Sequence, residues 1–195
     1  NIVGLTIGRN TALHNTYVQN RPVIESFNWK SKLLKEDEIG KAESLVLESV
    51  LLFEQGQAKS IAAGTIGDIS IKEIELNIAN NILSNAIIKQ EEGINKFQYL
   101  LSHALFIKEC RIGPGIKDIE LEEIKKLQEI AIELYEKGQQ LRDVPQDTSN
   151  EFYQKMSQAN LLERLAIEKL THSINQCKYH KNEAILAMLA KDNAF

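Results

Sequence analysis

The chain has 195 residues, of which 43% are hydrophobic and 26% charged, and these proportions are typical of a globular protein with a full core. Its 23 basic and 27 acidic residues give a formal net charge of -4, so no overall excess of positive charge indicates a nucleic-acid-binding or membrane-surface protein. No apolar run approaches the roughly 20 residues that cross a bilayer, and we therefore expect no membrane partner.

The two cysteines, Cys110 and Cys177, are too few for a disulfide framework in a chain of this size. We therefore expect both to be reduced thiols and the protein to lie in the reducing cytoplasm. The first eight residues are too short for a signal peptide and lack its basic start.

After the first 35 residues, apolar side chains recur at three- and four-residue steps, which predicts helices. The first predicted helix covers residues 36–53, and Gly56 is placed to cap its C-terminus. A second, long helix covers residues 57–90, with Gly64 and Gly67 in its first half. Each glycine costs about 1 kcal/mol in a helix interior, so either a neighbouring helix approaches closely there or the chain bends.

Three further segments complete the pattern in chain order. A third helix is predicted over residues 94–111 and is stopped by the Gly-Pro-Gly sequence at 113–115. A fourth covers residues 117–138 and ends at Gly138. The apolar residues that it is predicted to turn inward are Ile119, Leu121, Ile124, Leu127, Ile130 and Leu134.

The last helix is predicted to follow a loop at residues 139–147. A capping-box sequence at 148–151 opens it, and it continues with an interruption to Ala190. Alternation typical of strands is nearly absent. The predicted fold class is therefore all-α, an antiparallel bundle of four to five long helices that forms one domain over residues 1–195, with residues 1–35 as an N-terminal extension.

The N-terminal segment contains an Arg-Asn pair followed by a histidine, and the residue order Arg9, His14 resembles the active site of a class of small helical ribonucleases. An arginine holds a phosphate with two hydrogen bonds, and a histidine transfers a proton near neutral pH, so the pair suits RNA cleavage at the 2′-hydroxyl. The alternative is a polar segment on the surface.

The segment 94–111 places Tyr99, His103, Phe106 and Cys110 on one stripe of a helix. One interpretation makes His103 a histidine at the edge of the core with a hydrogen-bond partner. The other places His103 and Lys108 beside a crevice between helices, where burial moves their pKa values towards neutrality and makes them candidate catalytic residues.

Asp68 and Lys72 stand four positions apart, in the order that favours a surface ion pair worth a few tenths of a kcal/mol. If this face turned inward instead, a buried acid and lysine would be costly and would indicate a functional site.

Near the C-terminal end, His172, Cys177 and His180 lie within nine residues. Cys177 and His180 share a helical face, and with His103 and Cys110 from another helix they could supply four nitrogen and sulfur ligands to zinc. Their spacing matches no familiar zinc signature, so we expect neither a metal nor another cofactor.

The segment KAESLVLESVLLFEQGQAKSIAAGTIGDISIKEIEL, residues 41–76, resembles the opening of the AbiV-type abortive-infection family, which is placed among HEPN-like helical domains. Gly56 matches the family's turn between its first two helices, and the pair Ala62 and Ala63 matches its small residues. The acid and lysine of the family correspond to Asp68 and Lys72.

The next matching segment is FQYLLSHALFIKECR, residues 97–111, which resembles the family's following helix. There a Ser-His pair precedes a lysine, and the corresponding residues are Ser102, His103 and Lys108. The resemblance covers roughly residues 41–111.

This resemblance implies an all-helical, cytoplasmic phage-defence protein that acts on RNA or on the translation machinery as a homodimer, at most as a ribonuclease. The alternative is a binding module without catalysis, an adaptor or partner of a toxin or phage protein. The enzyme hypothesis requires that Arg9 and His14, or His103 with Lys72 and Lys108, converge in a cleft, which we expect to lie across a two-fold interface.

Overall fold

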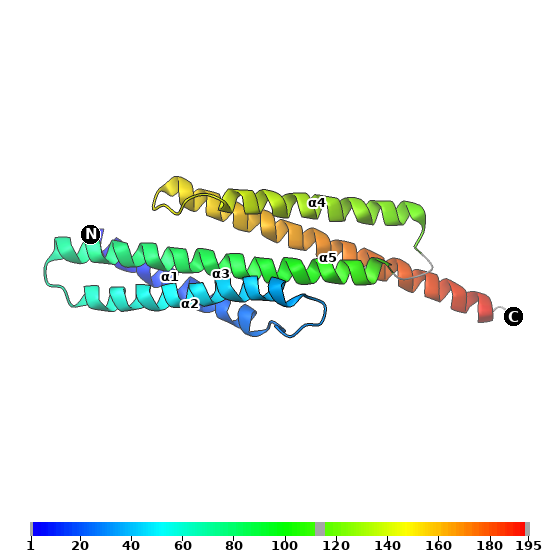
Figure 1. Ribbon diagram of the computed structural model, residues 1–195, viewed down its shortest axis with the longest axis horizontal. Helices are drawn as coiled ribbons and strands as arrows, with labels where there is room; N and C mark the ends of the chain where they lie inside the picture. The colour runs from blue at the N-terminus through cyan, green and yellow to red at the C-terminus, as the bar shows by residue number, and fades with distance from the viewer. Residues whose placement is uncertain (1, 112–115, 194–195) are drawn as a thin grey trace. The chain divides into compact units, whose positions relative to one another are not determined.

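The computed structural model describes residues 2–111 and 116–193, and within them the chain forms five α-helices and no strand (Figure 1). The helices are α1 Ile2–Glu25, α2 Glu36–Gly64, α3 Ile69–Arg111, α4 Asp118–Arg142 and α5 Asn150–Asn193. The all-α fold class predicted from the apolar spacing is thereby confirmed. None of these helices combines the length and the apolar character that crossing a bilayer requires.

The chain divides into two compact units, Asn1–Phe97 and Gln98–Phe195. The first unit contains α1, α2 and the N-terminal part of α3, and the second contains the remainder of α3 with α4 and α5. α3 is one uninterrupted helix and contributes to both units. The single domain expected over residues 1–195 stays a prediction.

The first unit includes the N-terminal segment as a full helix. Tyr17 of α1 stacks on Phe53 of α2, with ring centroids 4.0 Å apart and planes 7° apart. Leu83, Ala86 and Ile87 of α3 complete this apolar cluster. The 1–35 segment is thus no extension outside the bundle, because α1 supplies part of the core of the unit.

Buried amides of α3 bind the backbone of α1. Gln90 donates from Nε2 to the Tyr17 carbonyl oxygen at 3.0 Å and accepts from Asn20 Nδ2 at 3.0 Å. Asn80 donates from Nδ2 to the Thr6 carbonyl oxygen at 3.2 Å. Because such directional bonds need one alignment of the two helices, they define the register of α1 against α3.

Gly56 is an interior residue of α2, and the helix end predicted there is wrong. A Cβ on Gly56 would lie 2.8 Å from the Leu83 side chain, so glycine is required by the close approach of α3. α2 ends at Gly64, and the chain bends there. Of the two explanations offered for Gly64 and Gly67, a closely approaching helix or a bend in the chain, the bend is the one found. The predicted break between the second and third helices is also wrong, because α3 continues through Gly93.

In the second unit α4 and α5 lie side by side, and their facing residues form the core with α3 (Figure 1). α4 buries Ile124, Ala131 and Tyr135. Two residues predicted to point inward do not, because Ile119 is 73% exposed and Ile130 is 43% exposed. The true stripe contains alanine and tyrosine, which a pattern of aliphatic residues alone misses.

The ends of α4 and α5 differ from the predicted ones. α4 continues past Gly138 to Arg142, since a Cβ on Gly138 would lie 2.9 Å from Glu163 Cγ and glycine is needed there for packing. α5 is capped by Ser149, whose Oγ accepts from the Phe152 amide at 3.2 Å, and it runs without interruption to Asn193. The predicted Gly-Pro-Gly stop at 113–115 lies outside the described residues.

Cys110 of α3 and Cys177 of α5 are joined by a disulfide, with their Cα atoms 5.9 Å apart. The expectation of two reduced thiols is therefore wrong. Cysteine number alone does not reveal which helix positions face each other, and here the packing of α3 on α5 brings the two sulfurs together. The expected cytoplasmic location rested on free thiols and loses that basis.

Candidate functional site

Arg9 and His14 do not form a pair in the structure. Arg9 is exposed, whereas His14 is half-buried with its ring centroid 5.1 Å from that of Phe53. Five positions along an α-helix turn the side-chain direction by about 140°, so the two residues leave α1 in different directions. The two side chains therefore do not converge within one chain.

Asp68 acts as the N-terminal cap of α3. Its Oδ1 accepts from the Ile71 amide at 3.1 Å, and its carbonyl oxygen accepts from the Lys72 amide at 2.9 Å. Asp68 is exposed and Lys72 half-buried, and between these two described residues no ion pair forms. A capping carboxylate turns towards the helix amides and away from the lysine side chain. The ion pair in this region instead joins Lys59 of α2 to Glu75 of α3 at 2.5 Å.

His103 lies half-buried at the seam between α3 and α4. Its Nε2 is 3.4 Å from Nε2 of Gln128, and its ring centroid is 6.0 Å from that of Tyr99. Tyr99 stacks on Tyr135 at 3.7 Å, and burial, reinforced by the nearby Glu136 carboxylate, raises the pKa of Tyr99 to about 12. This is the arrangement of a histidine at the core edge with a hydrogen-bond partner.

Lys108 does not accompany His103. It is exposed and stands five positions further along α3, which again turns its direction by about 140°. A groove of about 390 Å³ lies beside His103, between α3 and α4. It is lined by Phe106, Ile107, Cys110, Leu121, Lys125 and Gln128. The groove is mainly apolar and holds no acid and base pair for proton transfer.

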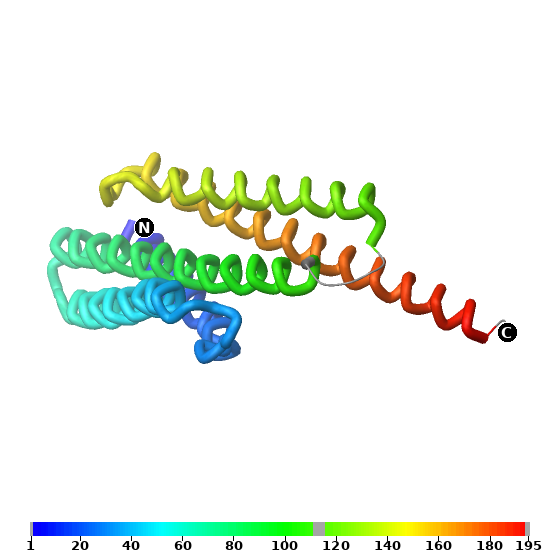
Figure 2. The backbone as a smooth tube through the Cα atoms, turned by 45° about the vertical axis from the view of Figure 1, so that its right-hand side comes forward, coloured from blue at the N-terminus to red at the C-terminus, as the bar shows by residue number. Residues whose placement is uncertain are grey.

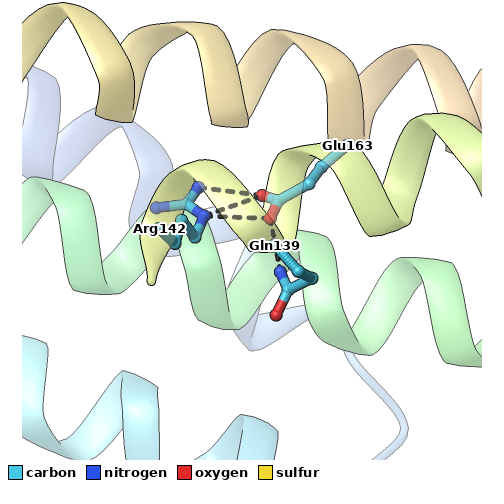
Figure 3. A network of polar contacts seen from close by, with 3 residues as sticks. All are labelled: Gln139, Arg142 and Glu163. Carbon is cyan, nitrogen blue, oxygen red and sulfur yellow. Dashed lines mark hydrogen bonds and ion pairs between the residues drawn. The ribbon is translucent and has the colours of Figure 1, made fainter. Parts of the chain in front are cut away.

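The most buried charged cluster is one that the sequence pattern did not indicate (Figure 3). Arg142 donates from Nε and Nη2 to both carboxylate oxygens of Glu163 at 2.8 to 3.1 Å, and Gln139 donates to Glu163 Oε2 at 2.5 Å. The side chains of Glu163 and Arg142 are 0% and 5% exposed. Because the carboxylate is enclosed and held by these donors, we assign the cluster to packing of α4 on α5 and not to binding.

The histidines near the disulfide also have partners of their own. His180 Nδ1 lies 3.5 Å from Glu120 of α4, and Lys181 donates to the carbonyl oxygen of Glu109. His172 is on the exposed side of α5, with Nε2 3.1 Å from Gln176. Both cysteine sulfurs are bonded to each other, and among the described residues no group of ligands suited to a metal is found.

A second groove, of about 540 Å³, lies along α5 beside Gln98 of α3. Its lining comes from one stripe of α5 with Ile167 beside it and Gln98 of α3 opposite. The stripe consists of Leu161, Arg164, Leu165, Glu168, Thr171, His172 and Asn175. Leu161 is 58% exposed, and Arg164 and Glu168 are exposed. Neither charge takes part in an ion pair with any described residue.

Comparison with protein-family models, with curated proteins and with solved structures finds no match to this chain. The resemblance of residues 41–111 to AbiV-type proteins therefore stays a prediction.

Proposed function

We propose that this chain is a non-catalytic helical binding module, and that the groove along α5 receives an amphipathic helix of a partner protein. The observation that carries the proposal is the coincidence, in one groove, of an exposed leucine with two unpaired charges. Within one chain, Arg9 and His14 leave α1 in different directions, as His103 and Lys108 leave α3, which favours the binding module over a ribonuclease.

The dimensions of the groove favour a helix over a small molecule. From Leu161 to Asn175 the stripe spans fourteen positions, which corresponds to about 21 Å along the axis. Small-molecule sites are enclosed and mostly apolar, whereas this groove is open along α5 and mixes apolar with charged residues. A partner helix that places residues at three- and four-residue steps into the groove matches both features.

The charges define the partner more closely. Arg164 and Glu168 stand one turn apart, and both are available for contacts with another chain. We expect the partner helix to carry an acidic residue opposite Arg164 and a basic residue one turn away opposite Glu168, beside a leucine-type residue that covers Leu161. Charged residues at the rim select the partner and its direction more than they add affinity.

The test is selection of binders from a displayed library of helical peptides, with the purified chain as target. We expect the selected peptides to share this acidic, basic and apolar pattern and to lose at least tenfold in affinity for Leu161→Asp. The matched control is Ile119→Asp, which changes an even more exposed isoleucine of α4 outside the groove and should leave binding unchanged.

A charge exchange makes the test specific to the groove. The double variant Arg164→Glu, Glu168→Lys should reject the selected peptides and bind versions in which the two charges are swapped. Binding that survives both Leu161→Asp and the charge exchange would contradict the proposal. So would cleavage of total RNA by the purified chain that is abolished in His14→Ala or His103→Ala.

The resemblance to AbiV-type proteins adds no residue to the α5 side of this groove, since that side lies outside residues 41–111. An adaptor in a phage-defence system acts by binding a toxin or a phage protein in the cytoplasm, so the role that the resemblance implies requires Cys110 and Cys177 to be reduced. The disulfide between Cys110 and Cys177 favours an oxidising compartment over the cytoplasm, and we propose that the module works there.

A further inference from the structure

The C-terminal end of α5 is an apolar helix segment with no cover among the described residues. Figure 2 shows that the C-terminal part of α5, drawn in red, continues beyond the N-terminal end of α4. From Ile185 onward every described residue of α5 is exposed. The four large apolar side chains there are 52% to 63% exposed, and they are Ile185, Leu186, Met188 and Leu189.

These four side chains form one continuous face. Ile185 and Leu189 lie one above the other at its centre, and Leu186 and Met188 flank them, so the face covers about 160° of the helix. A face of this width is broader than the seam of a simple coiled coil and is typical of a helix that packs against another helix. Two polar residues, Asn182 and Asp192, continue the same face at either end.

The sequence of this segment is symmetric about its middle. Residues 184–190 read Ala-Ile-Leu-Ala-Met-Leu-Ala, the same order of small and large apolar residues in both directions. Antiparallel pairing of two such segments about a two-fold axis at the level of Ala187 therefore sets Ile185 of each copy opposite Leu189 of the other. Such an interface uses the same surface on both copies and is closed by a single contact.

The polar ends of the face determine the direction of pairing. In the antiparallel arrangement the Asn182 side chain of one copy lies opposite the Asp192 carboxylate of the other. The Asn182 amide N–H can then donate a hydrogen bond to that carboxylate. Parallel pairing would place the two Asp192 carboxylates beside each other, where like charges repel. The sequence thus favours the antiparallel direction.

We propose that residues 182–192 of α5 form an antiparallel, two-fold contact with the same residues of a second copy of this chain. The contact is small. Four large side chains on each copy bury on the order of 800 Å² in total, below the roughly 1,200 Å² of a standard stable interface, so the dimer is weak and depends on concentration. This proposal uses a surface distinct from the α5 groove and does not rest on the binding function proposed above.

Sedimentation equilibrium of the full chain tests the contact over about a hundredfold range of concentration. We expect the average mass to rise from monomer towards dimer with concentration, and the double variant Ile185→Asp, Leu189→Asp to stay monomeric at the highest concentration. Ile119→Asp, an exposed isoleucine outside the face, should dimerise as the unchanged chain does. An unchanged chain that stays monomeric throughout, or a double variant that still dimerises, would overturn the proposal.

Cysteine cross-linking tests the direction. An Ile185→Cys chain mixed with a Leu189→Cys chain should form a disulfide-linked heterodimer far faster than either variant alone. Self-linking of Ile185→Cys at the same rate would indicate parallel pairing and overturn the antiparallel contact. Loss of the dimer in Leu161→Asp would show that the copies meet at the α5 groove and not at residues 182–192, and would overturn the proposal. An unchanged dimer in that variant would show that the groove takes no part in the contact.

Discussion

At the residue scale, the most informative side chains are polar ones that the apolar pattern passes over. Glu163 occupies a buried position of α5, and its charge is stabilised there by the hydrogen bonds that Arg142 and Gln139 donate to its carboxylate (Figure 3). Burying an ion pair costs solvation free energy. Removing one partner of a buried pair lowers the stability of the fold even more, because the other charge then loses its opposite charge.

Glu163→Ala should therefore lower the free energy of unfolding by about 3 to 5 kcal/mol, because it removes the carboxylate that accepts hydrogen bonds from the buried Arg142 guanidinium. Urea denaturation followed by circular dichroism measures the change. The control is Glu133→Ala, which removes an exposed pair with Lys137 at 3.3 Å and should cost less than about 1 kcal/mol.

A second variant separates charge from packing at the same place. Arg142→Met combined with Glu163→Leu removes both charges and should recover most of the lost stability. If the single and double variants were equally unstable, the loss would come from packing and the ion pair would have no special role.

At the element scale, the glycines decide how closely helices approach. Gly56 and Gly93 interrupt the helical pattern in the sequence but lie inside unbroken helices, each against a neighbour. A glycine within a helical pattern can therefore indicate either the end of the helix or the close approach of a neighbouring helix. Only the facing helix distinguishes them.

Gly56→Leu should destabilise the first unit by about 1 to 3 kcal/mol, because the new side chain collides with Leu83. Gly40→Leu in the same helix is the matched control, since nothing lies within 4 Å of a Cβ there and leucine favours a helix more than glycine does. The midpoint temperature of thermal unfolding should therefore fall in Gly56→Leu and rise in Gly40→Leu. Equal shifts in the two variants would argue against the tight contact at Gly56.

At the scale of the whole chain, the disulfide links two helices that are far apart in the sequence. Cys110 and Cys177 are separated by 67 positions, so the bond restricts a long loop in the unfolded chain. It joins α3 to α5 within the second unit, three positions before His180, whose Nδ1 contacts Glu120 of α4.

Reduction of this bond, or the double variant Cys110→Ser, Cys177→Ser, should lower the free energy of unfolding of the second unit by about 2 to 4 kcal/mol. Mass spectrometry after alkylation in denaturant gives the direct check. Protein purified without reductant should take up no label, and reduced protein should take up two. Two labels on untreated protein would mean that the thiols are free and would restore the cytoplasmic expectation.

The fold class follows from the sequence alone because helix formation is largely a local property. Apolar residues at three- and four-residue steps predicted helices in the regions of α2 to α5, and the structure contains them. The all-α class needed no knowledge of which helix contacts which. α1 was missed because its apolar residues follow no single face and part of its contact with α3 consists of hydrogen bonds from buried amides.

The candidate sites depended on tertiary structure because they combine residues from different helices. The sequence placed His103 correctly on the stripe with Tyr99 and Phe106, but which partner it meets is decided by α4. The Cys110 to Cys177 bond, the enclosure of Glu163 and the exposure of Leu161 have no local signal, since each depends on the facing surface of another helix. Local spacing determines where helices form, and the packing of one helix on another determines which of their side chains are paired, buried or free to bind.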